Sequence, residues 1–210
     1  MSASEAKQGP PVDLFRGEHV RLTMEEPACL GKAFSRWERD SEYTRLLNTS
    51  GGPLWSQVKF KEWFEKDAEK EEPQEILFGI RLRAVERRRR AEQEVPSRSE
   101  VPEDVLIGYV CLWGLEWNHG EACVSIGIGE RQYWGSGYGT QAMRLTLRYA
   151  FTELNLARVS LGVFDYNARA IRSYQKAGFS IEGRERQRLR RDGCRADLVI
   201  MGALRHEWHE

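Results

Sequence analysis

A chain of 210 residues is long enough to bury a core, and 32 basic residues balanced by 32 acidic ones exclude a global field that would attract nucleic acid or an anionic membrane. Four cysteines without a C-x-x-C pair favour reduced thiols. No apolar run approaches the roughly 18 residues of a membrane span and no signal peptide is visible, so we expect a cytoplasmic protein with neither nucleic acid nor membrane as partner.

The start of the chain divides into a polar tail and a first strand. Residues 1–12 are small, polar and proline-bearing, which predicts a disordered tail before a single domain over residues 13–210. Val20, Leu22 and Met24 alternate with polar residues, as expected for a strand with one buried face.

Two helices and two strands are expected next. Apolar residues recur at helical spacing from Pro27 to about Leu47 and from Ser56 to about Lys70. Segments 75–84 and 105–115 are the clearest strand runs in this half of the chain. Between them, residues 84–104 form a charged insertion without an apolar period, which predicts an exposed loop.

Two polar segments are assigned to loops. The basic run Arg87–Arg90 in the insertion invites a phosphate-binding or nucleic-acid-binding interpretation, but neighbouring glutamates cancel most of its charge and favour a solvated loop. Residues 117–120 read W-N-H-G, a sequence typical of a hairpin turn. His119 is therefore interpreted as a turn residue, with catalysis as the minority reading.

Segment 121–130 predicts a strand with two unlike faces. The faces carry Val124, Ile126 and Ile128 on one side and Ser125, Gly127 and Gly129 on the other. Because the second face has almost no side chains, another backbone or a ligand can approach it closely.

Segment 131–143, RQYWGSGYGTQAM, places Gly135, Gly137 and Gly139 between this strand and an amphipathic helix. The apolar face of that helix is predicted from Met143, Leu147, Ala150 and Leu154. Thr140 is a candidate cap for its start. Amides at a helix N-terminus that no side chain screens favour a phosphate or diphosphate.

Several readings of the glycine loop compete. A nucleoside triphosphate loop needs G-K-[ST], which does not occur in the chain. A dinucleotide fold needs G-x-G-x-x-G directly after a strand, whereas here Glu130–Trp134 intervene and the next acid, Asp165, comes late. A glycine-rich turn that only packs a helix on a sheet is the structural alternative. Coenzyme A is a third candidate ligand, and a family resemblance suggests it.

Two motifs support coenzyme A. The segment Q-Y-W-G-S-G-Y-G-T resembles the acyl-CoA signature of the GNAT superfamily of N-acetyltransferases, with Gln132, Gly135 and Gly137 at the signature positions. Downstream, NARAIRSYQKAGF (residues 167–179) resembles the second signature of the same superfamily. The ends of the chain, LFRGEHVRLTMEEP and DGCRADLVIMGALRHEW, are similar to the RimJ/RimL-like subgroup that acetylates N-terminal amines of ribosomal proteins and related small amines. The charged insertion departs from this subgroup.

This resemblance implies an α/β (α+β) fold with a mixed, mainly antiparallel sheet of six or seven strands and helices on both faces. It implies transfer of an acetyl group from acetyl-CoA to a primary amine without a metal, in a monomer or homodimer. The strand Val124–Gly129 is expected to splay from its neighbour so that pantetheine can pair with its edge. The implied cofactor-binding residues are Ile126, Gly127, Ile128, Gln132, Trp134, Gly135, Ser136, Gly137, Tyr138, Gly139, Thr140 and Asn167.

Two catalytic residues are proposed within this framework. Tyr174 matches the family position that protonates the departing thiolate, although on periodicity alone it is a core tyrosine. Glu116 is the leading candidate among several acids and His119 near the central strands for the general base. Two alternatives stay open: an acyl-CoA-binding module without turnover, and an NAD-binding oxidoreductase of Rossmann type.

Overall fold

A computed structural model describes residues 13–48, 54–69, 75–86, 89 and 103–209. Its centre is one seven-stranded sheet in the order β1-β2-β3-β4-β5-β7-β6. The strands are β1 (Val20–Thr23), β2 (Glu75–Leu82), β3 (Val105–Glu116), β4 (Glu121–Ile128), β5 (Arg158–Phe164), β6 (Ser180–Arg191) and β7 (Cys194–Leu204). All neighbouring strands are antiparallel except β4 and β5. The expected mixed, mainly antiparallel sheet is confirmed, and a doubly wound Rossmann sheet is excluded.

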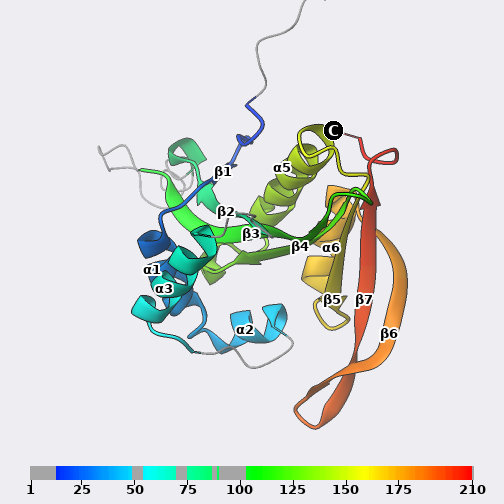
Figure 1. Cartoon of the computed structure of the whole chain (residues 1–210). Helices are drawn as coiled ribbons and strands as arrows, with labels where there is room; N and C mark the ends of the chain where they lie inside the picture. The colour runs from blue at the N-terminus through cyan, green and yellow to red at the C-terminus, as the bar shows by residue number, and fades with distance from the viewer. Residues whose placement is uncertain (1–12, 49–53, 70–74, 87–88, 90–102, 210) are drawn as a thin grey trace, which may run out of the picture.

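Helices cover both faces of the sheet (Figure 1). The helices are α1 (Pro27–Trp37), α2 (Ser41–Leu47), α3 (Gln57–Ala68), α5 (Tyr138–Thr152) and α6 (Ala168–Ala177). A short 3-10 turn, Arg131–Tyr133, precedes α5. The first three helices pack on one face and the last two on the other, and each face has its own apolar cluster.

The single helix expected from Pro27 to about Leu47 is wrong, because the chain forms two helices there. Asp40 adopts an extended backbone, and its carboxylate accepts hydrogen bonds from the amides of Glu42 and Tyr43 as the N-cap of α2. A capping aspartate competes with helix continuation by satisfying the amides of the next helix. The break turns α2 across the sheet towards β4, which it contacts.

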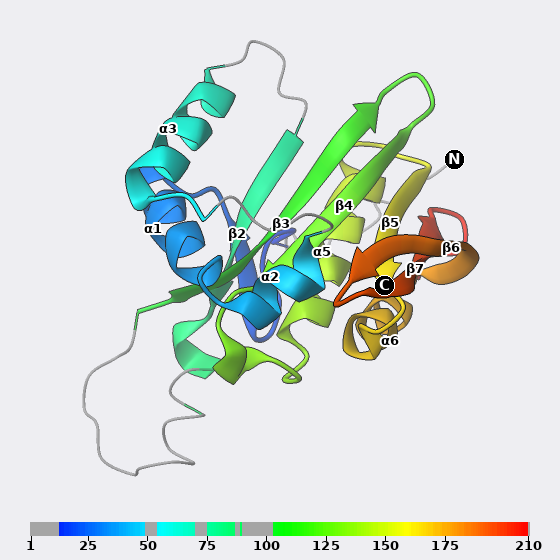
Figure 2. The same cartoon turned by 90° about the horizontal axis from the view of Figure 1, so that it is seen from below.

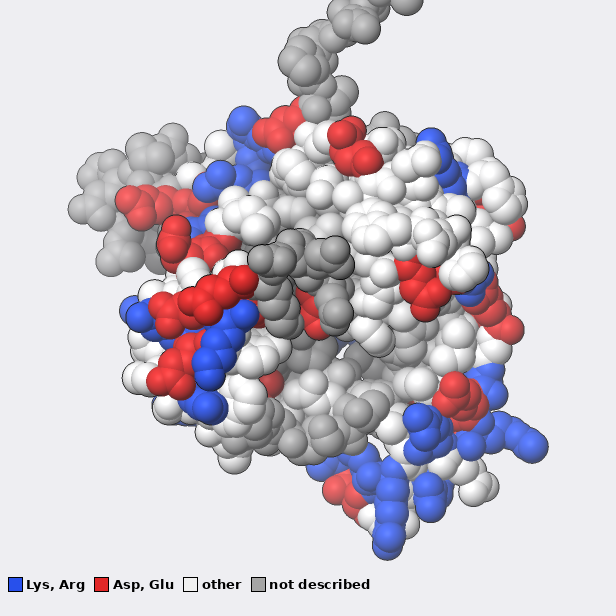
Figure 3. Space-filling model, viewed as in Figure 1, with Lys and Arg blue, Asp and Glu red and all other residues white. Residues whose placement is uncertain are grey.

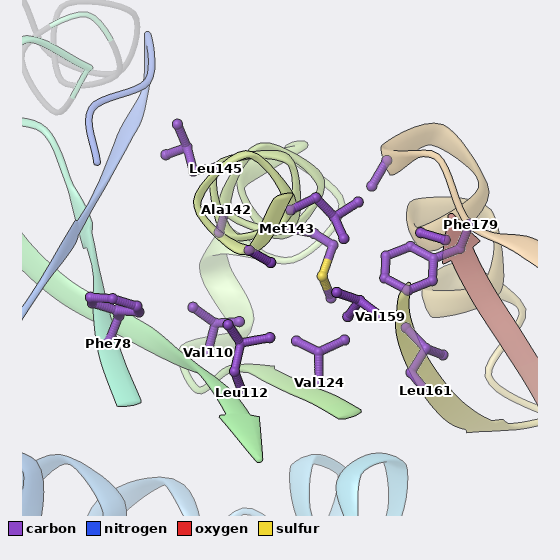
Figure 4. Packing of buried hydrophobic residues seen from close by; sticks show 14 of the residues in the cluster. Phe78, Val110, Leu112, Val124, Ala142, Met143, Leu145, Val159, Leu161 and Phe179 are labelled. Atoms are coloured by element: carbon purple, nitrogen blue, oxygen red, sulfur yellow. The ribbon is translucent and has the colours of Figure 1, made fainter. Parts of the chain in front are cut away.

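The main core lies between the sheet and α5. Met143 and Leu147 of α5 are completely buried, as is Ala150, in agreement with the expected apolar face. Figure 4 shows the Met143 side chain pointing towards Val159 of β5, with Phe179 beside them. The expected fourth member, Leu154, follows the end of the helix and is only partly buried.

The first residues of the expected insertion are not a solvated loop. Glu86 is 5% exposed, and its carboxylate contacts His19, the hydroxyl of Tyr138 and Arg89. Of the basic run, Arg89 is exposed and paired with Glu86, while Arg87, Arg88 and Arg90 lie outside the described residues, as do the tail 1–12 and most of the insertion. The base of the insertion is thus part of the folded core.

No helix in the described ranges is long and apolar enough to cross a membrane. Likewise, the part of the chain that the structure covers holds no group of three or more side chains suited to a metal ion. Residues 117–120 form the expected turn between β3 and β4, with Gly120 at φ +67° and His119 exposed.

Candidate active site

Strands β4 and β5 pair only at their beginnings. Three positions are in register, from Glu121 opposite Arg158 to Cys123 opposite Ser160, and the strands diverge beyond them. Figure 2 shows the two strands close together beside the β3–β4 hairpin and separating along their length. The expected splay is therefore present, and it leaves the second half of β4 with one open edge.

The hydrogen-bond pattern shows which groups lie on this open edge. The amide of Gly129 donates to the carbonyl of Ile107 in β3 at 2.9 Å. Because hydrogen-bonded pairs alternate along an antiparallel ladder, Gly127 also bonds towards β3, while Ile126 and Ile128 turn their amides and carbonyls towards the gap. These main-chain groups can pair with an extended amide-bearing ligand or donate to a developing oxyanion.

The bare face of β4 is filled by aromatic side chains. A Cβ at Gly127 would lie 2.5 Å from the hydroxyl oxygen of Tyr43, and a Cβ at Gly129 would overlap the Trp37 ring. The sequence predicts that another backbone or a ligand approaches this face, whereas the side chains of Tyr43 and Trp37 occupy it at the two glycines. The glycines first admit residues of α1 and α2, which brings those helices into contact with the central strands.

The glycine loop ends in an uncapped helix N-terminus. Gly135 and Gly137 adopt φ +76° and +85°, a left-handed conformation that side chains disfavour. Helix α5 begins at Tyr138 with Gly137 as N-cap, and no side chain caps it. The first turn of α5 and its positive dipole end suit a diphosphate. Gly139 lies within the helix and needs no special backbone conformation.

Two side chains of this loop differ from their expected roles. Thr140 does not cap α5; its hydroxyl lies 2.7 Å from that of Ser173 in α6 and ties the two helices together. Tyr138 is buried and its hydroxyl donates to Glu86 at 2.9 Å, so its side chain is held within the fold. Gln132 and Ser136 are exposed beside the loop.

Trp134 crosses the mouth of the gap. Its indole Nε1 donates to the carbonyl of Ile128 at 2.6 Å, so this carbonyl of the open edge already has a partner. The guanidinium of Arg169, from α6, lies 4.1 Å from the centroid of the same ring. Trp134 thus links the open edge of β4 to α6 by a hydrogen bond and a cation–π contact.

Asn167 and Tyr174 occupy opposite ends of α6. The side chain of Asn167 accepts a hydrogen bond from the amide of Ala170, which confirms the capping role. At the other end, Gly178 at φ +113° ends the helix and the buried Phe179 follows. Tyr174 is partly buried against the main core, and desolvation raises the pKa of its phenol to about 12. At neutral pH this phenol keeps its proton and can donate it.

The structure brings most of the expected site residues together. Gly139 packs near the side chain of Ile128, and Thr140 contacts the residue before Tyr174, so the start of α5 joins β4 and α6. Glu116 lies elsewhere. It is exposed at the end of β3, opposite Glu121, and Ile126 lies five positions after Glu121, about 16 Å along an extended strand.

Sequence reasoning missed three residues beside the gap: Glu38, Tyr43 and Tyr109. Tyr109 of β3 lies opposite Gly127, and Tyr43 lies against the same glycine. Glu38 follows Leu30 and Phe34 at four-residue steps, which places a carboxylate on the apolar face of α1. A charged residue at an apolar position of an amphipathic helix is the sequence signal from which Glu38 could have been found.

A surface cavity of about 380 Å³ lies beside Trp37 and Gly129. It is lined by Arg36, Trp37, Asp40, Gly129, Glu130, Arg131 and Gln132. Its acids are already paired, since Arg36 bonds Glu130 and Arg131 bonds Asp40. The pairing with Arg131 lowers the pKa of Asp40 to about 2.

Comparison with known proteins agrees with this geometry. The model of the acetyltransferase (GNAT) domain family matches residues 21–180. The chain belongs to the GNAT acetyltransferase family. It is an acetyl-CoA-dependent N-acetyltransferase.

Individual relatives vary in how much of the chain they match. "Probable N-acetyltransferase YjcK" of Bacillus subtilis is 30% identical over 129 residues, 60% of this chain and 71% of that protein. Spermidine N(1)-acetyltransferase of Escherichia coli K12 is 35% identical over 77 residues, 37% of this chain and 41% of its own length. The chain thus spans less than half of this second relative.

A solved structure gives the same fold. Spermidine N-acetyltransferase from Vibrio cholerae, in complex with CoA and spermine, superimposes with a TM-score of 0.71 at 21% identity. The match covers 91% of this chain and 98% of the other. At this identity the structural similarity establishes the fold of this GNAT enzyme. It does not identify the acceptor.

Proposed function

We propose that this enzyme acetylates a primary amine, either a small amine or the N-terminal α-amine of a peptide, with Tyr174 as the general acid. One observation carries the proposal. The start of α5 lies against Ile128 on the open edge of β4 and against Ser173, the residue before Tyr174 in α6. The RimJ/RimL-like ends of the chain favour a peptide amine, whereas the spermidine-acetylating relatives favour a small amine.

Each element of the gap has a distinct task. Amides at the start of α5 hold the diphosphate, and Gln132 and Ser136 border it. The amides of Ile126 and Ile128 bind the pantetheine arm, and one of them donates to the thioester oxygen as negative charge develops. When the tetrahedral intermediate collapses, Tyr174 gives its proton to the leaving thiolate. Asn167 fixes the helix that carries Tyr174.

The first test measures ligand preference and turnover. Thermal shift with acetyl-CoA and with NAD should show stabilisation by acetyl-CoA alone. Thiol release should then be followed with peptides that begin with alanine, serine or threonine, with simple monoamines and with polyamines. Binding of acetyl-CoA without thiol release in any arm would support the module without turnover and overturn the proposal.

The second test is Tyr174→Phe, which removes the proton donor and keeps the ring. Loss of a general acid should lower kcat by about 100-fold. The affinity for acetyl-CoA should stay within about twofold, because the diphosphate binds elsewhere. An unchanged kcat would remove the acid role from Tyr174.

A further inference from the structure

A buried carboxylate lies at the base of the charged insertion. Glu86 belongs to a short helical segment, residues 84–86, that follows β2, and it is 5% exposed. The other end of the insertion returns to the same place. The amide of Ala84 donates to the Asp104 carboxylate at 2.7 Å, and Arg21 of β1 pairs with that carboxylate. The insertion is therefore closed at its base by contacts between described residues, and Glu86 is part of this base.

Both oxygens of the Glu86 carboxylate have partners. Oε1 accepts hydrogen bonds from the Tyr138 hydroxyl at 2.9 Å and from Arg89 at 3.1 Å. Oε2 lies 3.1 Å from His19 Nδ1 and 3.0 Å from Arg89 Nε. Burial of Glu86 opposes its ionisation, but hydrogen bonds from Arg89 and Tyr138 outweigh burial, so its pKa lies below the usual value. At neutral pH the Tyr138 hydroxyl therefore donates to a charged acceptor, and such hydrogen bonds are stronger than neutral ones.

Tyr138 is the first residue of α5 and directly follows the glycine loop. The N-cap before it is Gly137, at φ +85°, and the helix begins with a hydrogen bond from the amide of Gln141 to the carbonyl of Gly137 at 3.0 Å. The amides that precede Gln141 belong to the first turn, which is the part of α5 proposed to hold the diphosphate. A displacement of Tyr138 would therefore redirect these amides.

A second contact holds the same face of α5. Gln141 comes three residues after Tyr138, so the two side chains share one face of the helix. The Oε1 atom of Gln141 accepts hydrogen bonds from the amides of His19 and Val20 at 2.9 and 2.8 Å. Thr140, in contrast, contacts α6. One face of the first turn is thus tied to β1 and to the base of the insertion.

The glycine loop needs such an external constraint. Gly135 and Gly137 reach positive φ because they have no Cβ, and the same property gives glycine more conformational freedom than any other residue. Binding to a loop with this freedom includes the free-energy cost of ordering it, whereas a loop already held in its bound shape avoids that cost. The hydrogen bond between Glu86 and Tyr138 fixes the first residue after the loop.

We propose that Glu86 is a positioning residue for the diphosphate of acetyl-CoA and acts through Tyr138 at the start of α5. The inference rests on the proposed diphosphate site and deepens it, because it gives the base of the insertion a task in cofactor binding. Glu86 itself touches neither the cofactor nor the acceptor. Its removal should therefore weaken the binding of ligands that carry the diphosphate and leave the chemical step unchanged.

Glu86→Gln tests the inference because it removes the charge and nearly keeps the shape. Loss of the charge-assisted hydrogen bond should weaken CoA binding about tenfold in calorimetry. Acetyl-pantetheine, which carries the thioester arm without the diphosphate, should bind both proteins equally. The KM for acetyl-CoA should rise in parallel, while kcat at saturating substrates stays within about twofold of wild type.

Tyr138→Phe removes only the hydroxyl and supplies the test if Glu86→Gln does not fold. It should weaken CoA binding to a similar extent, and the double variant should bind no more weakly than either single variant, because both remove the same hydrogen bond. The matched control is Glu25→Gln, since the Glu25 side chain is 4% exposed and pairs with Arg81 of β2 at 2.6 Å. This control should lower thermal stability and leave the affinity for CoA unchanged.

The outcomes separate this inference from the proposed function. Unchanged CoA affinity in Glu86→Gln, or equal weakening of CoA and acetyl-pantetheine, would overturn the inference even if wild type acetylates amines. An equal loss of CoA affinity in Glu25→Gln would also overturn it, because general destabilisation would then explain the effect. A loss confined to CoA in a protein that releases no thiol would support the inference and overturn only the proposed function.

Discussion

Glu38 and Tyr43 illustrate how much of the site is decided by single side chains. Each places a polar group at a position where the surrounding pattern calls for an apolar one, and each is more than nine-tenths buried. Proteins usually keep a buried polar group at an apolar position where function requires it. We therefore expect the ionised carboxylate of Glu38 to weaken the fold.

Glu38→Gln should raise stability, and the gain should depend on pH. The folded-state pKa of Glu38 lies above 4.5, so the protonated form is favoured by folding. Its favourable contribution is complete below the unfolded-state pKa and is lost as the pH rises through the folded-state pKa. The difference in free energy of unfolding between variant and wild type should grow from pH 4.5 upward and then level off. Urea unfolding at a series of pH values measures it, and a constant difference would contradict the raised pKa.

Individual residues were predictable from the sequence only where a motif carried them. Asn167 and Tyr174 lie within one segment whose spacing resembles a family signature, and the structure puts them on one helix. Tyr43 has no such signal, because the glycine that accommodates it is Gly127, far along the chain. Contacts across that sequence distance depend on the packing of α2 on β4.

At the scale of elements, the three glycines of the loop have different roles that their regular spacing does not reveal. Gly135 and Gly137 need positive φ, whereas Gly139 is helical and a Cβ there would make an ordinary contact with Ile128 at 3.7 Å. The sequence located the loop and the helix after it. The turn geometry decided which glycines are indispensable.

Gly137→Ala and Gly139→Ala form a matched pair. A Cβ at φ +85° should cost about 1–2 kcal/mol of stability and weaken acetyl-CoA binding, because the turn that aims the first-turn amides is strained. Gly139→Ala should leave stability unchanged or raise it by about 0.5–1 kcal/mol, since alanine favours a helix. Chemical denaturation and a titration with acetyl-CoA measure both effects, and equal stability losses would refute the distinction.

At the scale of the whole molecule, the divergence of β4 and β5 creates the site, and the core under α5 holds the two strands in that position. At this scale, the distribution of charged side chains gives little indication of a binding face. In Figure 3, acidic and basic side chains are interspersed over α1 and α3, and arginines gather around the β6–β7 hairpin. Several of these arginines are paired, as in the contacts of Arg184 with Asp165 and Asp197.

Met143→Ala should test the core at this scale. Met143 is completely buried, and its truncation should cost about 2–5 kcal/mol through lost burial and a residual cavity. Met24→Ala is the matched control, because Met24 is 76% exposed and should change stability by less than about 0.5 kcal/mol. Urea midpoints compare the two, and similar values would show that the packing of α5 contributes little.

The sequence by itself determined the strand and helix pattern, the glycine loop, and the family, because periodicity and short motifs are local properties of the chain. It could not place Tyr43 and Tyr109 against Gly127, nor show that Glu116 lies at the paired end of β4, away from the gap. Only the tertiary structure decided these points, since they depend on how the α2 break, the strand register and the splay of the sheet combine. Burial is a property of that combination, and burial raises the pKa of the Glu38 carboxylate.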